Sequence, residues 1–191
     1  MNRLVTFCVL GALLACAVKE DQTASSSQTL GGSRCGNEVI SDRGIGELLI
    51  GRSADSVKRL CHVISDTTEL GGEGMPTRIM KVAFSHDSVE AEIDRGRVWR
   101  IEVASPKLRT ADSLGVGTSL ERLLLLKEPR GLGGEGALFL VSSQHCGLSF
   151  QLSESGSDAP PENWDRAALA RLPKSTVVDR VLIVGCGPAA S

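Results

Sequence analysis

The sequence predicts an α+β fold made of two tandem repeats, each a helix followed by antiparallel strands, with the helices packed on one face of the sheet. Two observations lead to this prediction. The pentapeptide LGGEG occurs at 70–74 and again at 132–136, with matching patterns on either side. Around each copy the hydrophobic spacing changes from a helical period to a strand period. We expect a globular domain at 38–188, with repeats at about 44–105 and 110–187.

Each repeat is predicted to begin with a helix. The segments 50–53 (IGRS) and 116–119 (VGTS) match and precede the apolar stripes. The first stripe has helical spacing and consists of Val57, Leu60, Cys61 and Ile64. The second begins with Leu120, Leu123 and Leu124, and Thr118 with Glu121 has the spacing of a capping box. We expect each LGGEG to be the turn at which the chain leaves its helix.

Strict alternation predicts antiparallel strands further along each repeat. Residues 88–93 and 99–103 alternate polar with apolar side chains. A three-residue loop at 95–97 would place Ile93 opposite Trp99, so Trp99 is predicted to lie in the core. In the second repeat we expect strands at 148–152 and 177–184, separated by an insertion at 153–176.

The insertion at 153–176 allows two interpretations. A short helix is expected between its prolines, with Trp164, Ala168 and Leu172 on one face. The helix could cover an open edge or face of the sheet. Alternatively, it could be a mobile binding element with Trp164 and Leu172 as anchors, because long loops often carry function.

The N-terminal residues predict export and lipid attachment. Residues 1–15 have one positive charge and an apolar run of about ten residues, too short to span a bilayer, which is typical of a signal peptide. The sequence Leu13-Leu14-Ala15-Cys16 resembles the lipobox of bacterial lipoproteins, which implies acyl chains on Cys16 and a membrane anchor. Residues 16–37 are polar and predict a flexible tether. Ala17 replaces the aspartate that retains such proteins in the inner membrane, which favours the outer membrane, facing the periplasm.

Four cysteines outside the signal peptide and anchor predict two disulfides in an oxidising compartment. Three pairings are possible. If Leu148 faces Val184 in an antiparallel pair, Cys146 lies opposite Cys186. The remaining pair, Cys35 with Cys61, would join the incoming segment to the first helix.

Composition and spacing exclude several classes of function. The net charge of −2 and the 3% aromatic content argue against nucleic-acid binding. Because no closely spaced ligand pair occurs, we expect no metal and no cofactor. Glu73 and Glu135, one per LGGEG copy, are candidates for a binding pair of carboxylates, although solvated loop acids are commoner. A hydrolase would require His62, His86 or His145 to meet a nucleophile and a carboxylate.

The helix openings Gly51-x-Ser53 and Gly117-x-Ser119, with the order of elements over 44–187, resemble two families. These are the small SmpA/OmlA-type lipoproteins and the β-lactamase-inhibitor-protein family. The resemblance implies a lipid-anchored, non-enzymatic scaffold that binds another envelope protein. A periplasmic hydrolase, or an inhibitor of a periplasmic enzyme, is the alternative.

Overall fold

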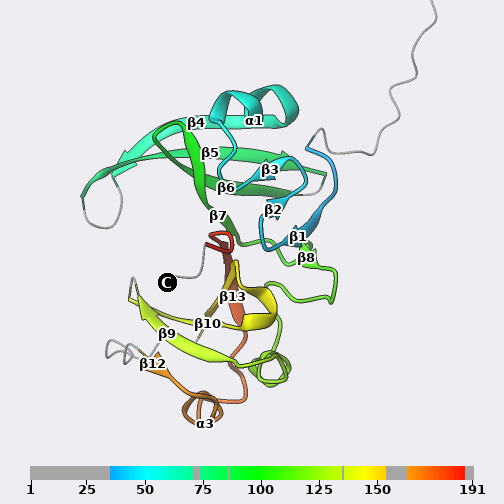
Figure 1. Ribbon diagram of the computed structural model, residues 1–191, viewed down its shortest axis with the longest axis vertical. Coiled ribbons are helices and arrows are strands. Elements are labelled where there is room, and N and C mark those ends of the chain that lie inside the picture. The colour runs from blue at the N-terminus through cyan, green and yellow to red at the C-terminus, as the bar shows by residue number, and fades with distance from the viewer. Residues whose placement is uncertain (1–34, 71–73, 86, 135, 154–162, 188–191) are drawn as a thin grey trace, which may run out of the picture. The chain divides into compact units, whose positions relative to one another are not determined.

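A computed structural model of the chain describes residues 35–70, 74–85, 87–134, 136–153 and 163–187 (Figure 1). All of these residues belong to one unit, Gly31–Ser191. The predicted signal peptide, Cys16 and residues 17–34 lie outside the described residues. Cys35 is fully buried, so the folded part starts before the predicted boundary at residue 38.

Nine strands form one antiparallel sheet (Figure 1). Its order is β12-β9-β10-β11-β13-β7-β6-β5-β4. The strands of the first part of the chain are β4 (His62–Leu70), β5 (Pro76–Phe84), β6 (Asp87–Asp94) and β7 (Arg97–Val103). Those of the second part are β9 (Arg130–Gly134), β10 (Ala137–Val141), β11 (Leu148–Leu152), β12 (Asn163–Trp164) and β13 (Val178–Ile183). β13 pairs with β7, so the two sets of strands join at the centre of the sheet.

A second, small sheet has the order β3-β2-β1-β8. It consists of β1 (Val39–Ser41), β2 (Gly44–Ile45), β3 (Leu48–Leu49) and β8 (Arg109–Thr110). β1 and β2 are antiparallel, whereas β1 and β8 are parallel. Ile40, Ile45 and Leu48 of this sheet are buried in the same core as the large sheet.

The helices are short: α1 (Ala54–Leu60), α2 (Leu120–Leu123), α3 (Arg166–Leu169) and the 3-10 turn η1 (Ser143–His145). The side chain of Ser53 caps α1 by accepting a hydrogen bond from the Ser56 backbone N–H. Ser119 caps α2 in the same way. The predicted helix starts are therefore confirmed, but Ser119 occupies the cap position that the capping-box prediction assigned to Thr118.

The predicted fold class, α+β with tandem helix-and-strand repeats, is wrong. Strands account for 49% of the structure and helices for only 13%. The protein is a mostly β protein with two sheets, and its helices are brief connections between strands. Among the residues that the structure describes, no helix reaches the length and hydrophobicity that a membrane span needs.

The error has a local cause. α1 ends at Leu60, and Cys61 is already extended, so Ile64 belongs to β4 and not to a helical stripe. The β-branched residues of β4 favour a strand, and pairing with β5 along the full length of β4 provides the tertiary contacts that decide between the two structures. Leu70, the first residue of one LGGEG copy, ends β4, and residues 132–134 of the other copy belong to β9, so neither copy begins at the end of a helix.

A second error concerns the turn between β6 and β7. The connection is a two-residue turn at Arg95 and Gly96, where φ is 46° and 77°, and not a three-residue loop. A bulge between Glu92 and Ile93 then shifts the register, so that Ile93 pairs with Val98. Gly96 suits a positive φ because it has no Cβ.

The shifted register reverses the environment of Trp99. Val98 takes the core position and is 1% exposed, while Trp99 is 47% exposed. The prediction that Trp99 lies in the core is therefore wrong. Beyond the bulge the predicted register holds, since Ala91 pairs with Ile101 as expected.

Both predicted disulfides, Cys35–Cys61 and Cys146–Cys186, are present. The register that led to the second was wrong by one residue, because Leu148 pairs with Ile183 and not with Val184. Cys146 follows η1 and lies outside the strand. The Val184 N–H donates to the Gly147 carbonyl at 2.9 Å, which brings the two cysteines together just beyond the strand ends.

Candidate functional site

The two faces of the nine-stranded sheet differ in character. On β6, Val89, Ala91 and Ile93 are buried in the core, and the side chains between them point to the opposite face. We call this opposite face the open face. Register places Lys81 beside Glu90, and Glu90 beside Glu102, so charged side chains follow one another across β5, β6 and β7 on the open face.

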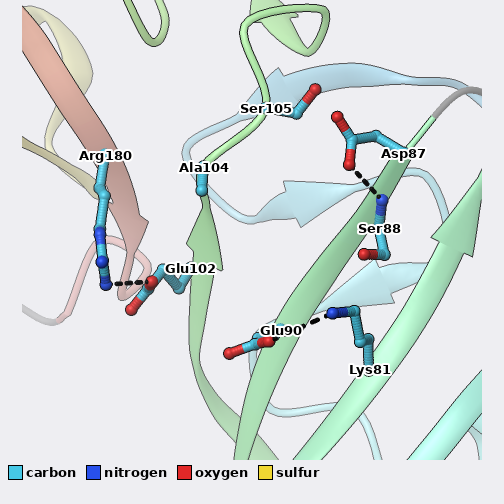
Figure 2. A pocket seen from close by; sticks show the side chains of 8 residues that line it. All are labelled: Lys81, Asp87, Ser88, Glu90, Glu102, Ala104, Ser105 and Arg180. Carbon is cyan, nitrogen blue, oxygen red and sulfur yellow. Dashed lines mark hydrogen bonds and ion pairs between the residues drawn. The ribbon is translucent and has the colours of Figure 1, made fainter.

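A hollow of about 390 Å³ lies on the open face where β5, β6, β7 and β13 run side by side (Figure 2). Figure 2 shows side chains from all four strands and from the segment after β7 around it. Its lining consists of Lys81, Asp87, Ser88, Glu90, Glu102, Ala104, Ser105 and Arg180. Two cations and three carboxylates give the lining a formal charge of 2 − 3 = −1.

Ion pairs join the charges around the hollow in two sets. Arg180 Nη1 lies 2.6 Å from Glu102 Oε1 and ties β13 to β7. Lys81 Nζ is 3.7 Å from Glu90 Oε1, a looser contact between half-exposed side chains. Exposed pairs of this kind contribute little to stability, so a ligand can replace them at small cost.

Asp87 is held in its ionised form at one end of the hollow. A hydrogen bond from the Ser105 side chain, and a second from the Ser88 backbone N–H at 2.9 Å, lower the pKa of Asp87 from its ordinary value. The carboxylate therefore supplies a fixed negative charge at neutral pH. Ser88 and Ser105 add hydroxyl groups that can donate or accept hydrogen bonds.

Trp99 stands on the open face near the start of β7, three residues before Glu102 of the hollow, in a three-residue cluster that we call the tryptophan cluster (Glu92, Trp99 and Arg100). The indole Nε1–H of Trp99 donates to Glu92 Oε2 at 3.1 Å. Arg100 Nε donates to the other oxygen, Oε1, at 2.7 Å, and the Arg100 guanidinium lies 5.3 Å from the centre of the indole ring. The aromatic ring is thus held in place although it is half exposed.

The predicted anchors Trp164 and Leu172 lie elsewhere. Both are partly buried and pack against the core. β12 pairs with the edge strand β9, with Trp164 opposite Gly131, and Leu169 of α3 is completely buried. The described part of the insertion covers the edge of the sheet at β9, in keeping with the first of the two interpretations. Trp164 Nε1 has no hydrogen-bond partner among the described residues.

Several other candidates lie outside the described residues. These are the lipidation site Cys16, the paired loop acids Glu73 and Glu135, and His86. Their predicted roles stay predictions.

The described histidines do not share a site. His62 begins β4 and His145 belongs to η1, before β11. Five steps of the sheet separate β11 from β4, at about 4.8 Å each.

His145 is held between two carboxylates. Its Nε2 lies 3.0 Å from Asp112 Oδ2, and its Nδ1 lies 3.5 Å from Asp42 Oδ1. Burial alone would raise the pKa of Asp112, but hydrogen bonds from Thr110 and His145 leave that pKa below its ordinary value. Because each ring nitrogen faces a carboxylate, neither is directed at a hydroxyl that it could activate, as a hydrolase would need. The ring links the β1–β2 turn, the segment after β8 and η1.

One group of possible metal ligands, Asp42 with Cys146 and Cys186, occurs among the described residues. The two sulfurs are joined in a disulfide and offer no thiolate. This group therefore does not constitute a metal site in the oxidised protein.

The two sheets and the two disulfides define the protein as a mostly β protein of the exported class. The chain matches no family model and no curated protein. Among solved structures it is similar to the crystal structure of the uncharacterized protein YfeY from Escherichia coli, with a TM-score of 0.53 and 17% identity. That match covers 76% of this chain and 98% of the YfeY chain, and at this identity it supports the fold alone.

Proposed function

We propose that the protein is a lipid-anchored envelope protein that binds another envelope protein through the open face of its large sheet and catalyses no reaction. The observation that carries the proposal is the tryptophan cluster, which shares the open face and the strands β6 and β7 with the charged hollow. Binding energy at protein interfaces concentrates in a few residues, and tryptophan and arginine are enriched among them. Trp99 and Arg100 offer both residue types in a fixed arrangement.

Preorganisation supports the same proposal. Glu92 and Arg100 side chains are only 16% and 17% exposed, and they hold the indole ring from two sides. Fixing Trp99 before the partner arrives avoids part of the entropy that an interface otherwise loses on binding. The partner is expected to offer an apolar pocket for Trp99 and hydrogen-bonding or basic side chains for the hollow.

Site-specific photo-crosslinking in intact cells of the native host tests the proposal. A photoreactive residue in place of Ser88, in the hollow, should crosslink to a protein of defined mass. Combining it with Trp99→Ala should reduce that adduct at least tenfold, about the effect of losing one dominant interface residue. The matched control carries the probe at Leu125, which is 72% exposed, follows α2 and belongs to none of the strands that line the hollow.

Three results would contradict the proposal. These are a Ser88 probe without a specific adduct, the same adduct from Leu125, and an adduct that Trp99→Ala leaves unchanged. The anchor is tested separately, because Cys16→Ala should release the protein from the membrane fraction and abolish its labelling by a fatty-acid probe. A Cys16→Ala protein that stays with the membrane would contradict lipid attachment only.

A further inference from the structure

His145 lies between two carboxylates that come from distant parts of the chain. Its Nε2 is 3.0 Å from Asp112 Oδ2, in the segment after β8, and its Nδ1 is 3.5 Å from Asp42 Oδ1, in the β1–β2 turn. The His145 side chain is 16% exposed, and its ring is nearly perpendicular to that of Phe150, with the two centroids 6.5 Å apart. Most of the imidazole is therefore shielded from water, and each of its nitrogens faces an acidic group.

Only one protonation state of the ring suits both of these neighbours. A neutral imidazole has one N–H donor and one nitrogen lone pair, whereas the imidazolium ion donates from both nitrogens. An ionised carboxylate can only accept. A neutral ring would therefore direct a lone pair at one of the two carboxylates, and only the imidazolium ion offers a hydrogen to each of them.

Asp42 provides a second, independent observation. Its Oδ1 is buried and has no hydrogen-bond partner in the described part of the chain. A buried carboxylate oxygen without a donor is costly. A hydrogen on His145 Nδ1 would lie towards this oxygen. Among the described residues, the ion pairs of Asp42 and Asp112 involve neither lysine nor arginine, so the two negative charges favour a positive charge on the ring between them.

We propose that His145 is an imidazolium ion at neutral pH and fastens the β1–β2 turn to η1, and that this contact loosens when the ring loses its second proton. The turn packs closely on the backbone after η1, since a Cβ at Gly147 would lie 2.0 Å from the Asp42 carbonyl oxygen. The neighbouring disulfide Cys146–Cys186 ties that backbone to the segment after β13. His145 thus connects the small sheet to a covalently fixed part of the chain.

The other groups around the ring keep their charge between pH 6 and 9. The neutral ones are Thr110, which donates to Asp112, Gln144 of η1, Phe150 of β11 and the Cys146–Cys186 disulfide. The charged ones, besides the two aspartates, are Arg43 in the β1–β2 turn and Glu128 and Arg130, which line a hollow at Cys146. Carboxylates and guanidinium groups do not ordinarily titrate in this range. A change at this contact between pH 6 and 9 therefore reports on the imidazole.

The direction of the pH dependence follows from proton binding. An unfolded chain loses the second imidazole proton near pH 6.5, whereas the folded chain retains it between the two carboxylates. Above that pH the folded state binds more protons than the unfolded state, so stability falls as the pH rises through the range in which the folded ring is titrated. The full contribution is present below about pH 6.5, while both aspartates are still ionised.

Nitrogen-15 NMR of the histidine rings, in the full chain with Cys16→Ala, tests the protonation state. At pH 7.5 both nitrogens of His145 should carry a hydrogen, while the exposed His62 of β4 should be mostly neutral and serves as the internal reference. His145→Gln identifies the signals. Asp42→Asn should lower the pH at which His145 loses its second proton by at least about one unit, a tenfold change in proton affinity. Asp94→Asn, an exposed acid elsewhere, should not change it.

A His145 ring that titrates together with His62, or that Asp42→Asn leaves unchanged, would overturn the proposal. In that case a water molecule, and not the ring, would be the donor to Asp42 Oδ1.

Hydrogen exchange tests the effect on the small sheet. After correction for base catalysis, the amides of β1 and β2 should exchange at least about tenfold faster once His145 is neutral, and those of β5 and β6 should not. In His145→Gln, which cannot be protonated, the exchange of β1 and β2 should no longer depend on pH. His62→Gln is the matched control and should retain the dependence of the unsubstituted protein. Equal protection of β1 and β2 on both sides of the titration would refute the pH-dependent contact.

Discussion

Trp99 occupies an environment opposite to the one that its sequence pattern indicates, whereas Trp164 takes the covering role that was one of the two interpretations of the insertion. Trp99 follows a clean alternation, yet the bulge between Glu92 and Ile93 turns it towards solvent. Trp164 lies in a polar insertion, yet it pairs with β9 and packs on the core. A bulge adds one residue to one strand, and alternation read from a single sequence contains no signal for it.

The two tryptophans should therefore differ in their contribution to stability. We expect Trp164→Ala to lower the free energy of unfolding by about 2–3 kcal/mol through loss of packing, and Trp99→Ala to lower it by less than about 1 kcal/mol. Urea unfolding followed by circular dichroism measures both. Trp164→Phe is the control, since it keeps most of the packing and removes an N–H that has no partner in the described part of the chain.

Fluorescence gives a second measurement of the same difference. The chain has two tryptophans and no tyrosine, so each single substitution leaves one reporter. The Trp164→Phe protein, which retains Trp99, should emit at longer wavelength and be quenched more by acrylamide than the Trp99→Phe protein. Equal quenching of the two proteins would contradict the burial described above.

Because of Asp66, the free energy of unfolding should depend on pH in the acidic range. The hydrogen bonds from Arg78, together with Lys58, lower the pKa of Asp66 far below its ordinary value of 3.8. Because the pKa of Asp66 is lower in the folded protein than in the unfolded chain, the ionised carboxylate stabilises the fold at neutral pH. This stabilisation is lost progressively as the pH falls below about 4. We expect Asp66→Asn to cost about 1 kcal/mol at pH 7 and less at pH 2–3, measured by thermal unfolding.

The control for this prediction is Asp94→Asn. Asp94 lies 3.9 Å from Arg95, but both side chains are well exposed, so its loss should have no measurable effect at either pH. If Asp66→Asn costs as much at pH 2–3 as at pH 7, the carboxylate charge is not what stabilises this part of the sheet.

At the scale of elements, strands with one buried face were predictable and the others were not. β6 and β11 alternate clearly and match the predictions closely, whereas β7 alternates except at its bulge and β13 is buried at its last three positions. β10 is buried at four of its five positions, and β4 is mostly exposed, so neither shows a period of two. The strand state of these segments depends on their neighbours in the sheet, which no local pattern contains.

β12 and α3 of the insertion pack tightly against β9 at Gly131, where there is no room for a side chain. A Cβ at this position would lie 2.8 Å from Trp164 Cβ and 3.0 Å from Leu169 Cδ2. We expect Gly131→Ala to displace β12 and α3, to lower the free energy of unfolding by about 1–3 kcal/mol, and to speed proteolysis within 153–176. Gly134→Ala on the same strand is the control, because a Cβ there meets only Phe139, at 4.0 Å. Equal effects of the two substitutions would contradict this packing.

At the scale of the whole molecule, the disulfides were the best-predicted feature. The pairing of Cys146 with Cys186 was obtained despite a register error of one residue, because cysteines just past the strand ends can meet in either register. The candidate site, by contrast, was not predicted. Its lining comes from β5, β6, β7 and β13, and only the long-range pairing of β7 with β13 assembles it.

Each disulfide should stabilise the fold mainly by restricting the unfolded chain. Cys35–Cys61 and Cys146–Cys186 close loops with sequence separations of 26 and 40 residues. We expect replacement of either pair by alanine to lower the free energy of unfolding by about 3–4 kcal/mol, with the larger loss for the second pair. Urea unfolding of the two double variants measures this, and a loss below about 1 kcal/mol for both would contradict it.

The central position of β13 has a consequence for how the protein matures. β13 is the last strand in the chain order, yet it lies between β11 and β7 and completes the ladder that connects the early strands to the late ones. Until it arrives, the hydrophobic sides of both strand groups lack their common neighbour. A nascent polypeptide would then stay loose enough to thread through a secretion pore, and would acquire its final architecture only after translocation is finished.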